Sequence, residues 1–173
     1  PPLDYKTEVF ELNVRLRDKA YALSGQAGLI ESAESKAWRQ RYDYAPANQP
    51  PVVTRCDTLA GDTWYSGTRL SERAEEWTRL LTNGQGRYCT TQQEDNATYE
   101  ALLRASRLGK VDLQRLAVVR AGSDFDRPAK GASEVDNLLD YAKQGGFAPA
   151  LENLYRTGNP LVQEIVEHWD VWQ

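Results

Sequence analysis

The stretch VVRAGSDFDRP, residues 118–128, passes from apolar residues directly into a serine and two carboxylates: Ser123, Asp124 and Asp126. Its apolar half belongs to a strand that we predict over residues 115–120. A carboxylate at the end of a buried strand is costly unless it is paired or used. Two interpretations therefore stay open at this point: the acidic residues cap a turn, or they take part in chemistry.

The residues before this stretch alternate between strand and helix patterns. Short strands are predicted over residues 52–57 and 87–92, and helical apolar periodicity covers residues 69–81 and 95–108. Together with the strand at 115–120, this order predicts right-handed crossovers and an α/β fold. The sheet is expected to be mostly parallel or mixed, with the apolar third strand at its centre.

Further helices are predicted on both sides of this unit, and all of them fit one domain over residues 1–173. The sequence contains no methionine and does not open with the basic-then-apolar layout of a secretory signal. Three strands also form a thin sheet for this length, so we interpret the sequence as a processed chain or a fragment. The additional helices cover residues 12–23, 32–42, 134–143, 149–156 and 161–172, and Gly158-Asn159-Pro160 separates the last two.

Composition argues against several classes of protein. The net charge is −4 and there is no basic block, which argues against binding to nucleic acid or to an anionic membrane. No apolar run approaches the roughly 18 residues that a membrane helix needs. The single histidine, His168, and the two cysteines leave little material for a metal site, so we expect no metal. Cys56 and Cys89 fit two buried thiols or one disulfide equally well.

Polar clusters follow each predicted strand, where open α/β sheets bind their ligands. Helix capping alone would explain Asp95 or Ser123. Carboxylates and aromatic faces at three neighbouring strand ends instead suit a ligand with a sugar and a flat base. A carboxylic acid beside a base nitrogen can also donate a proton to a departing base. The clusters are Gly61-Asp62-Thr63-Trp64-Tyr65, Gln92-Gln93-Glu94-Asp95 and Ser123-Asp124-Phe125-Asp126.

Several co-linear motifs resemble the purine nucleoside permease family, and the resemblance covers all 173 residues. They also resemble the second half of the nucleoside phosphorylase and nucleosidase fold. The resemblance implies the C-terminal half of a three-layer α/β fold with a mixed sheet, whose N-terminal half is absent from this chain. The motifs are CDTLAGDTWYSG, NGQGRYCTTQQED, VVRAGSDFDRP and FAPALENLYRTGNPLVQEIVEHWD.

The resemblance also implies roles for individual residues. Asp124 would face the purine and protonate its departing nitrogen, with Ser123 beside it. Glu94 would accept hydrogen bonds from the ribose hydroxyls. Trp64 would stack on the base, with Tyr65 next to it.

Two positions qualify these roles. Gln93 stands where nucleosidases usually have methionine, so the underside of the sugar would meet a polar group. Asp126 would repel Asp124 and raise its pKa. A pairing of Asp126 with Arg127 would cancel that effect, and the sequence leaves both arrangements open.

The resemblance leads to an expected function: binding of a purine nucleoside and cleavage of its N-glycosidic bond by a nucleoside phosphorylase or hydrolase. Asp124 would be the general acid, with phosphate as a co-substrate of phosphorolysis and no other cofactor. The alternatives are a nucleoside-binding, transport-associated protein without turnover, and a storage protein on the same scaffold.

The nucleophile side of such a site would come from the missing half, so we expect a second chain that carries it. The oligomeric state, including a homo-oligomer, is left open. The resemblance implies an extracellular or periplasmic location, and this location in turn favours a disulfide between Cys56 and Cys89.

Overall fold

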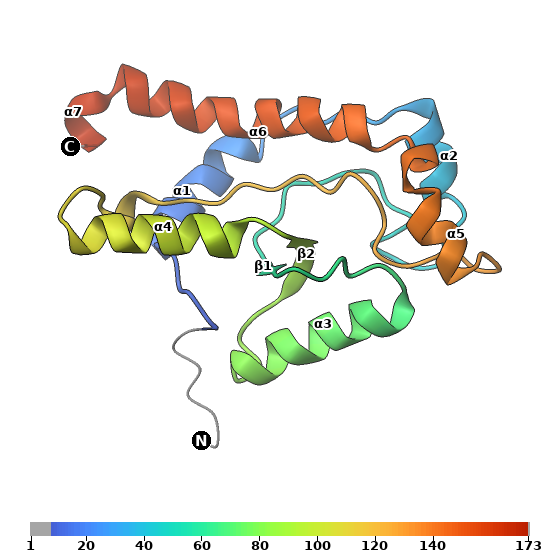
Figure 1. Ribbon diagram of the computed structural model, residues 1–173. Coiled ribbons are helices and arrows are strands. Elements are labelled where there is room, and N and C mark those ends of the chain that lie inside the picture. Colours follow the sequence, from blue (N-terminus) through green and yellow to red (C-terminus); the bar gives the residue numbers. More distant parts are fainter. Residues whose placement is uncertain (1–7, 173) are drawn as a thin grey trace.

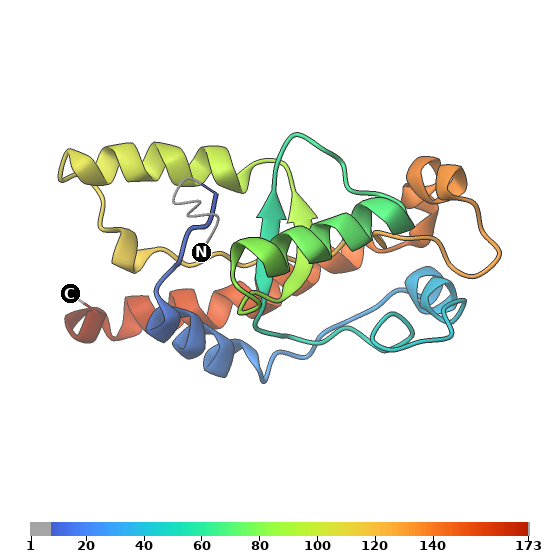
Figure 2. The same ribbon diagram turned by 90° about the horizontal axis from the view of Figure 1, so that it is seen from below.

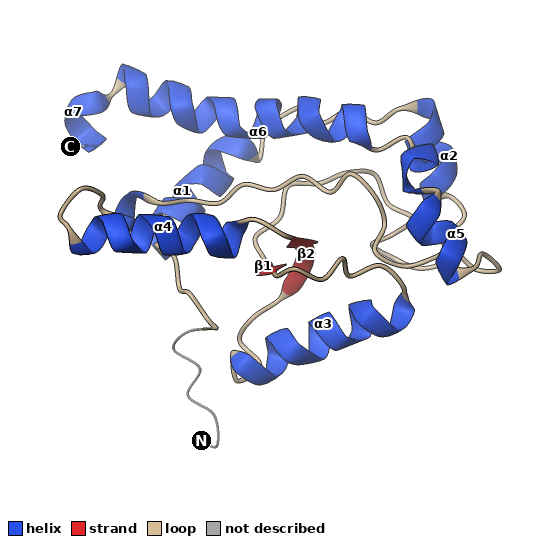
Figure 3. Ribbon diagram, in the orientation of Figure 1, coloured by secondary structure: helices blue, strands red, loops and turns tan. Residues whose placement is uncertain are grey.

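A computed structural model describes residues 8–172 and consists mainly of helices around a small sheet (Figure 1, Figure 3). The chain therefore has the α/β class that its pattern predicts. The helices are α1 (Val14–Ser24), α2 (Ala33–Arg39), α3 (Thr68–Leu81), α4 (Asp95–Arg107), α5 (Glu134–Leu139), α6 (Phe147–Glu167) and α7 (Trp169–Trp172), and the strands are β1 (Asp57–Ala60) and β2 (Tyr88–Gln92). Short 3₁₀ helices cover Leu113–Arg115 and Tyr141–Gln144.

The sheet consists of two parallel strands, β1 and β2, joined by a crossover through α3. Asp57 pairs with Tyr88 and Thr58 with Thr90, so one irregularity lies at the start of the register. The second strand is at its predicted place, whereas the first begins at the residue where the predicted strand was expected to end. The C-terminal ends of β1 and β2 lie side by side, so the polar residues that follow the two strands lie at the same edge of the sheet.

The predicted third strand over residues 115–120 is wrong. Arg115 ends a 3₁₀ turn, and the following residues are extended without a strand partner in the part of the chain that the structure describes (Figure 3). Val118 and Val119 are 41% and 39% exposed. Apolar composition favours an extended backbone, but a strand also needs a hydrogen-bonded neighbour, and a local pattern does not supply one.

The predicted break at Gly158-Asn159-Pro160 is also wrong, because α6 runs through it as one helix of 21 residues. A proline inside a helix removes a backbone hydrogen bond and costs about 3 kcal/mol. Packing of α1 against α6 offsets this cost: the Ser24 hydroxyl donates to the Thr157 carbonyl at 2.6 Å, and Lys19 pairs with Glu164 at 2.9 Å. Tertiary contacts therefore override the local signal.

The other helices agree closely with the sequence pattern. Ser32 and Ser35 form the capping box of α2, as their position before a helical run predicts. The bounds of α3 and α4 differ from the predicted ones by a single residue. The predicted helix at 134–143 instead divides into α5 and a 3₁₀ turn.

The buried apolar core of residues 8–172 is small. Larger apolar side chains are numerous but stay partly or largely exposed. In Figures 1 and 2, α6 and α1 lie side by side, and α3 lies across the sheet from below. None of the helices in this part of the chain has the length and apolar character that a bilayer span requires. The buried apolar residues are Ala20, Tyr42, Ala74, Ala129 and Ala150.

Candidate functional site

Hydrogen bonds link the three predicted strand-end clusters or the residues directly after them. The Gln93 side-chain amide donates to the carbonyl of Asp62 at 3.0 Å, which joins the first cluster to the second. The backbone N–H of Gly67, two residues after the first cluster, donates to the carbonyl of Asp126 in the third cluster at 2.7 Å. The first cluster thus contacts the second, and a residue just beyond the first cluster contacts the third, although the predicted third strand is absent.

Two buried amide side chains hold the loop that carries Asp124. Gln144 accepts from the backbone N–H of Phe125 at 2.6 Å, and Asn137 donates to the Phe125 carbonyl at 3.1 Å. The two amides also bond to each other at 3.4 Å, and they are only 1% and 3% exposed. Both polar backbone groups of Phe125 are therefore satisfied by side chains, which fixes the residues on either side of it.

Further contacts secure the end of the same loop. The Ser71 hydroxyl donates to the Asp126 carbonyl at 3.1 Å, and the Tyr42 hydroxyl donates to the Arg127 carbonyl at 2.8 Å. The Tyr42 ring stacks on Phe125 with centroids 4.5 Å apart. Burial raises the pKa of Tyr42 to about 12, so it stays a hydrogen-bond donor at neutral pH.

Gly146 lets α6 begin directly against this loop. A Cβ at this position would lie 2.9 Å from the carbonyl carbon of Ser123 and closer still to its oxygen. No other residue type fits here without displacing the backbone of Ser123. The first turn of α6 and the Asp124 loop are therefore in direct contact.

Asp124 is a partly buried carboxyl group with a hydroxyl neighbour. The Ser123 hydroxyl donates to Asp124 Oδ2 at 3.0 Å. Burial raises the pKa of Asp124, the hydrogen bond from Ser123 opposes that rise, and the charge of Asp126 adds to it. The net result is a carboxyl group that holds its proton to higher pH than an exposed aspartate does.

Asp126 takes part in both arrangements that the sequence leaves open. Arg127 Nε lies 3.4 Å from its carboxylate, and the same guanidinium pairs with Glu75 at 2.6 Å. The pairing with Arg127 does not remove the effect of Asp126, because Asp126 still contributes to the raised pKa of Asp124.

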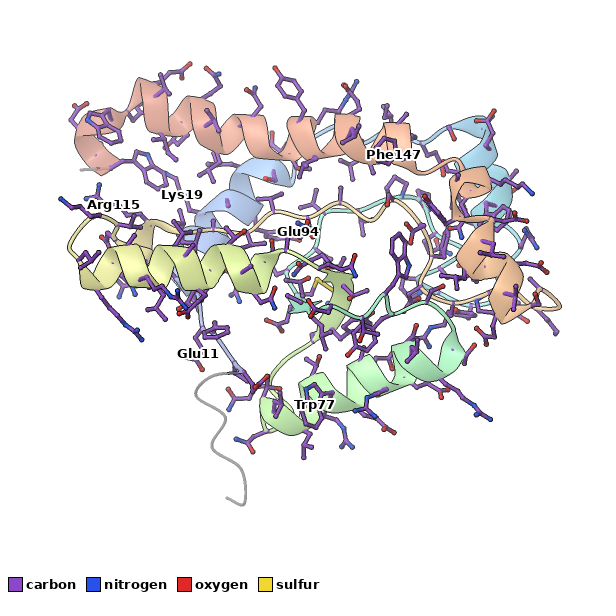
Figure 4. The ribbon with its side chains drawn as sticks, viewed as in Figure 1. Glu11, Lys19, Trp77, Glu94, Arg115 and Phe147 are labelled. Carbon is purple, nitrogen blue, oxygen red and sulfur yellow. A yellow bond between two sulfur atoms is a disulfide. The ribbon has the colours of Figure 1, made fainter. Side chains whose placement is uncertain are left out.

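Glu94 lies at the N-terminal end of α4, where Figure 4 labels it, and it pairs with Arg120 at 2.8 Å. Arg120 also reaches Asp95 at 3.4 Å. The hydrogen bond from Arg120 lowers the pKa of Glu94, so this carboxylate is ionised at neutral pH. Arg120 is not among the predicted site residues, and its only signal in the sequence is its position at the end of a predicted strand.

Trp64 presents an open aromatic face. Its side chain is 49% exposed and its ring lies 5.6 Å from that of Tyr141 in a tilted arrangement. Tyr65 beside it is partly buried. Among residues 8–172, no hydrogen bond or ion pair joins Asp124 to Glu94 or to Trp64. The three side chains thus have separate partners, namely Ser123, Arg120 and Tyr141.

A cavity of about 310 Å³ lies near this region, between α2 and α5. Asn137 lines it and also holds Phe125, so the cavity and the Asp124 loop share a wall. Asp124, Glu94 and Trp64 do not line it. Its other lining residues are Trp38, Arg41, Ala129, Gly131, Ala132, Asp136 and Asp140.

A disulfide joins Cys56 to Cys89, with Cα atoms 5.9 Å apart. Cys56 immediately precedes β1 and Cys89 lies within β2, so the bond ties the two strands together near their start. Figure 4 shows its sulfur atoms beside the sheet. The polar clusters follow the opposite ends of these strands.

Comparison with known proteins places this arrangement in a family. The model of the family described as purine nucleoside permease (NUP) matches residues 1–173. The chain belongs to the purine nucleoside permease family. A probable purine nucleoside permease of Schizosaccharomyces pombe is 39% identical over 170 residues, which are 98% of this chain and 49% of that protein.

A purine nucleoside permease of Candida albicans is 39% identical over 167 residues, which are 96% of this chain and 41% of that protein. The chain therefore spans half or less of the length of the curated relatives that it matches. No solved structure matches it significantly.

These findings correct the expected function. Both the family and the relatives carry the name of a permease, which denotes transport, and nothing in the comparisons indicates N-glycosidic bond cleavage. The expectation of a nucleoside phosphorylase or hydrolase with Asp124 as general acid is wrong. The transport-associated alternative is the better interpretation.

The expected location is corrected for the same reason. The family resemblance led to an extracellular or periplasmic location, as expected for a protein that cleaves or binds nucleosides outside the membrane. The relatives are named as permeases, and transport takes place at a membrane. The expectation of an extracellular or periplasmic protein is therefore wrong.

Proposed function

We propose that this chain is part of a purine nucleoside permease and binds the nucleoside reversibly at the three strand-end clusters. The match of the whole chain to the permease family is the observation that carries this proposal. Transport requires a ligand to be bound and released intact. The side chains at the clusters therefore act as hydrogen-bonding and stacking groups, and no bond of the nucleoside is broken.

The purine base is held by Trp64 and the Asp124 loop. The half-exposed indole of Trp64 offers a flat apolar face on which a base can stack. The carboxyl group of Asp124, oriented by Ser123, hydrogen-bonds to the polar edge of the base. Tyr65, next to Trp64, extends the aromatic wall.

The ribose is held by Glu94 and Gln93. Glu94 is ionised and already accepts from Arg120 and from the Gln93 backbone N–H, at 2.8 and 3.0 Å. A carboxylate offers about four acceptor positions, so two remain for ribose hydroxyls. The positive charge of Arg120 keeps this acceptor ionised in contact with the sugar.

The rest of the permease lies outside this chain. We propose that the part of the relatives which this chain does not match is supplied by further polypeptide, either a continuation or a second chain. In that larger protein, β1 and β2 belong to a wider sheet of a three-layer, phosphorylase-like fold. The small core and the segment 116–121, which has no strand partner among the described residues and in which Val118 and Val119 are exposed, support this part of the proposal.

Calorimetric titration of the 173-residue chain with inosine, guanosine and uridine tests the nucleoside site. We expect binding of the two purine nucleosides and a weaker response to uridine. Trp64→Ala removes the stacking face and is expected to weaken binding about tenfold or more. Trp169→Ala is the matched control, because Trp169 is 53% exposed on α7 and belongs to no cluster.

Chromatography of the same mixtures tests whether the nucleoside stays intact. We expect no free hypoxanthine or guanine after long incubation, with or without phosphate. Equal affinity for uridine, or no binding of any nucleoside, would contradict the proposed function.

A further inference from the structure

Helix α6 has an apolar stripe that faces away from the rest of the molecule. Five large side chains form this stripe, at intervals of four or seven residues, which is about one or two turns and places them on one side of the helix. They are far more exposed than core residues. The stripe consists of Phe147 (67% exposed), Leu151 (56%), Tyr155 (65%), Val162 (53%) and Val166 (67%).

The stripe is distinct from the face by which α6 packs on this chain. Ala150 and Thr157 are buried on that inner face, where Ser24 of α1 bonds to the Thr157 carbonyl. Figure 1 shows α6 along one edge of the molecule, and in Figure 4 many of its side chains project outward. The helix therefore has two apolar faces, of which α1 covers one.

Gly158 lies within the stripe, between Tyr155 and Val162. A Cβ at this position would meet nothing within 4 Å. Glycine weakens a helix, and here it leaves the backbone bare at the centre of an apolar surface. Such a surface lets an opposing element approach the backbone closely.

The charges beside the stripe favour a protein over a lipid surface. The polar side of α6 carries Glu152, Arg156, Gln163 and Glu167, and the whole chain has a net charge of −4. Helices that lie on membranes usually have a basic polar face. This one is acidic on balance, so an apolar protein face is the better complement.

The length of the relatives indicates which protein surface covers the stripe. This chain accounts for 49% of the permease of Schizosaccharomyces pombe and 41% of that of Candida albicans. We propose that the α6 stripe docks against an apolar face of the part of a family-length permease that this chain does not match. The proposal rests on the assignment to a permease but not on the nucleoside site.

Thiol labelling in a chimera tests this docking. The chain replaces the matching 170 residues of the Schizosaccharomyces pombe relative, and single cysteines are introduced by Val162→Cys or Leu151→Cys. Gln163→Cys is the matched control on the polar side of the helix. Free thiols are absent from residues 8–172, because Cys56 and Cys89 form a disulfide, so within this chain labelling with a maleimide reports on the introduced residue. The chimera without an introduced cysteine gives the background labelling that is subtracted.

We expect all three cysteines to react readily in the 173-residue chain. In the chimera, labelling at positions 151 and 162 is expected to slow at least about tenfold, while position 163 is unaffected. Equal labelling at 162 in both proteins would overturn the proposal. If labelling of the 173-residue chain alone slows as its concentration rises, the stripe binds a second copy of the chain and the proposal is wrong. If added lipid vesicles slow the labelling, the stripe binds lipid and the proposal is also wrong.

A two-chain experiment keeps the proposal testable where the chimera does not fold. The unmatched part of the relative is co-expressed with the tagged 173-residue chain, and capture of one by the other is measured. Burial of two aliphatic side chains predicts that Leu151→Gln with Val162→Gln weakens this association about a hundredfold. No capture by the unaltered chain would contradict docking.

Inosine titration of the same samples separates this proposal from the nucleoside site. Unprotected cysteines with intact inosine binding contradict only the docking surface. Protected cysteines without inosine binding contradict only the site.

Discussion

At the scale of single residues, the best-defined feature is the backbone of Phe125, held on both sides by buried amides. The side chains of Asp124 and Asp126 flank this fixed point, so their positions depend on Gln144 and Asn137 rather than on a regular strand. Neither amide stands out in the sequence. A glutamine before two glycines is normally exposed, and only the folded chain shows that it is buried.

Replacement of Gln144 by leucine is expected to destabilise the fold by about 1 to 3 kcal/mol, because the buried N–H of Phe125 loses its acceptor. Leucine keeps a similar volume, so the lost hydrogen bond is the main change. Chemical denaturation measures the effect. Gln85→Leu, at an exposed turn, is the control, and an equal loss in both variants would show that Gln144 has no special role.

Replacement of Asp124 by asparagine is expected to raise stability at neutral pH. The folded state raises the pKa of Asp124 above 3.8 through burial, so ionisation is less favourable in the folded chain than in the unfolded one. The contribution of this carboxyl to stability is complete below pH 3.8 and falls as pH rises through the raised pKa. Asparagine does not ionise, so the variant does not lose this stability as the pH rises.

Thermal melts of the Asp124→Asn variant and the unaltered chain between pH 3 and pH 8 measure this effect. The variant should have the higher melting temperature at pH 7, and the difference should shrink as the solution becomes acidic. The control variant Asp170→Asn, at an exposed site on α7, should have the same melting temperature as the unaltered chain at every pH in this range. A lower melting temperature of Asp124→Asn at pH 7 would contradict the assigned effect of burial.

At the scale of elements, the sequence predicts where most helices lie, but it does not predict which elements pair or pack with one another. Residues 69–81 and 95–108 show clear helical periodicity, and α3 and α4 follow it within a residue. Residues 115–120 have the composition of a strand, but pairing depends on distant residues that the local pattern does not contain. Pro160 fails as a helix break for the same reason, because α1 supports the helix from outside.

The disulfide is expected to contribute about 3 to 4 kcal/mol to the stability of the sheet, because it closes a loop between residues 33 apart in sequence. The double variant Cys56→Ser with Cys89→Ser should unfold at correspondingly lower denaturant concentration. Reducing agent should lower the stability of the unaltered chain to that of the variant and leave the variant unchanged. An effect of reductant on the variant would show that the loss has another origin.

At the scale of the whole molecule, the candidate site was predictable as a set of clusters but not as a set of contacts. The carboxyl ends of β1 and β2 meet at one edge, which brings Gln93 to Asp62, whereas Gly67 contacts Asp126 although the described residues just before Asp126 form no strand. Which carboxylate is paired depends on packing, so Arg120 beside Glu94 emerges only in three dimensions. The permease family, in contrast, was visible in the order of the motifs.

Gly146 joins two regions that the sequence keeps separate. The first turn of α6 touches the carbonyl of Ser123, so the helix cannot slide toward the loop without pushing it. A displacement of α6 along its axis would therefore also displace the loop that carries Asp124, through the contact between Gly146 and Ser123. The position of α6 and the position of the Asp124 loop are thus coupled through the contact at Gly146.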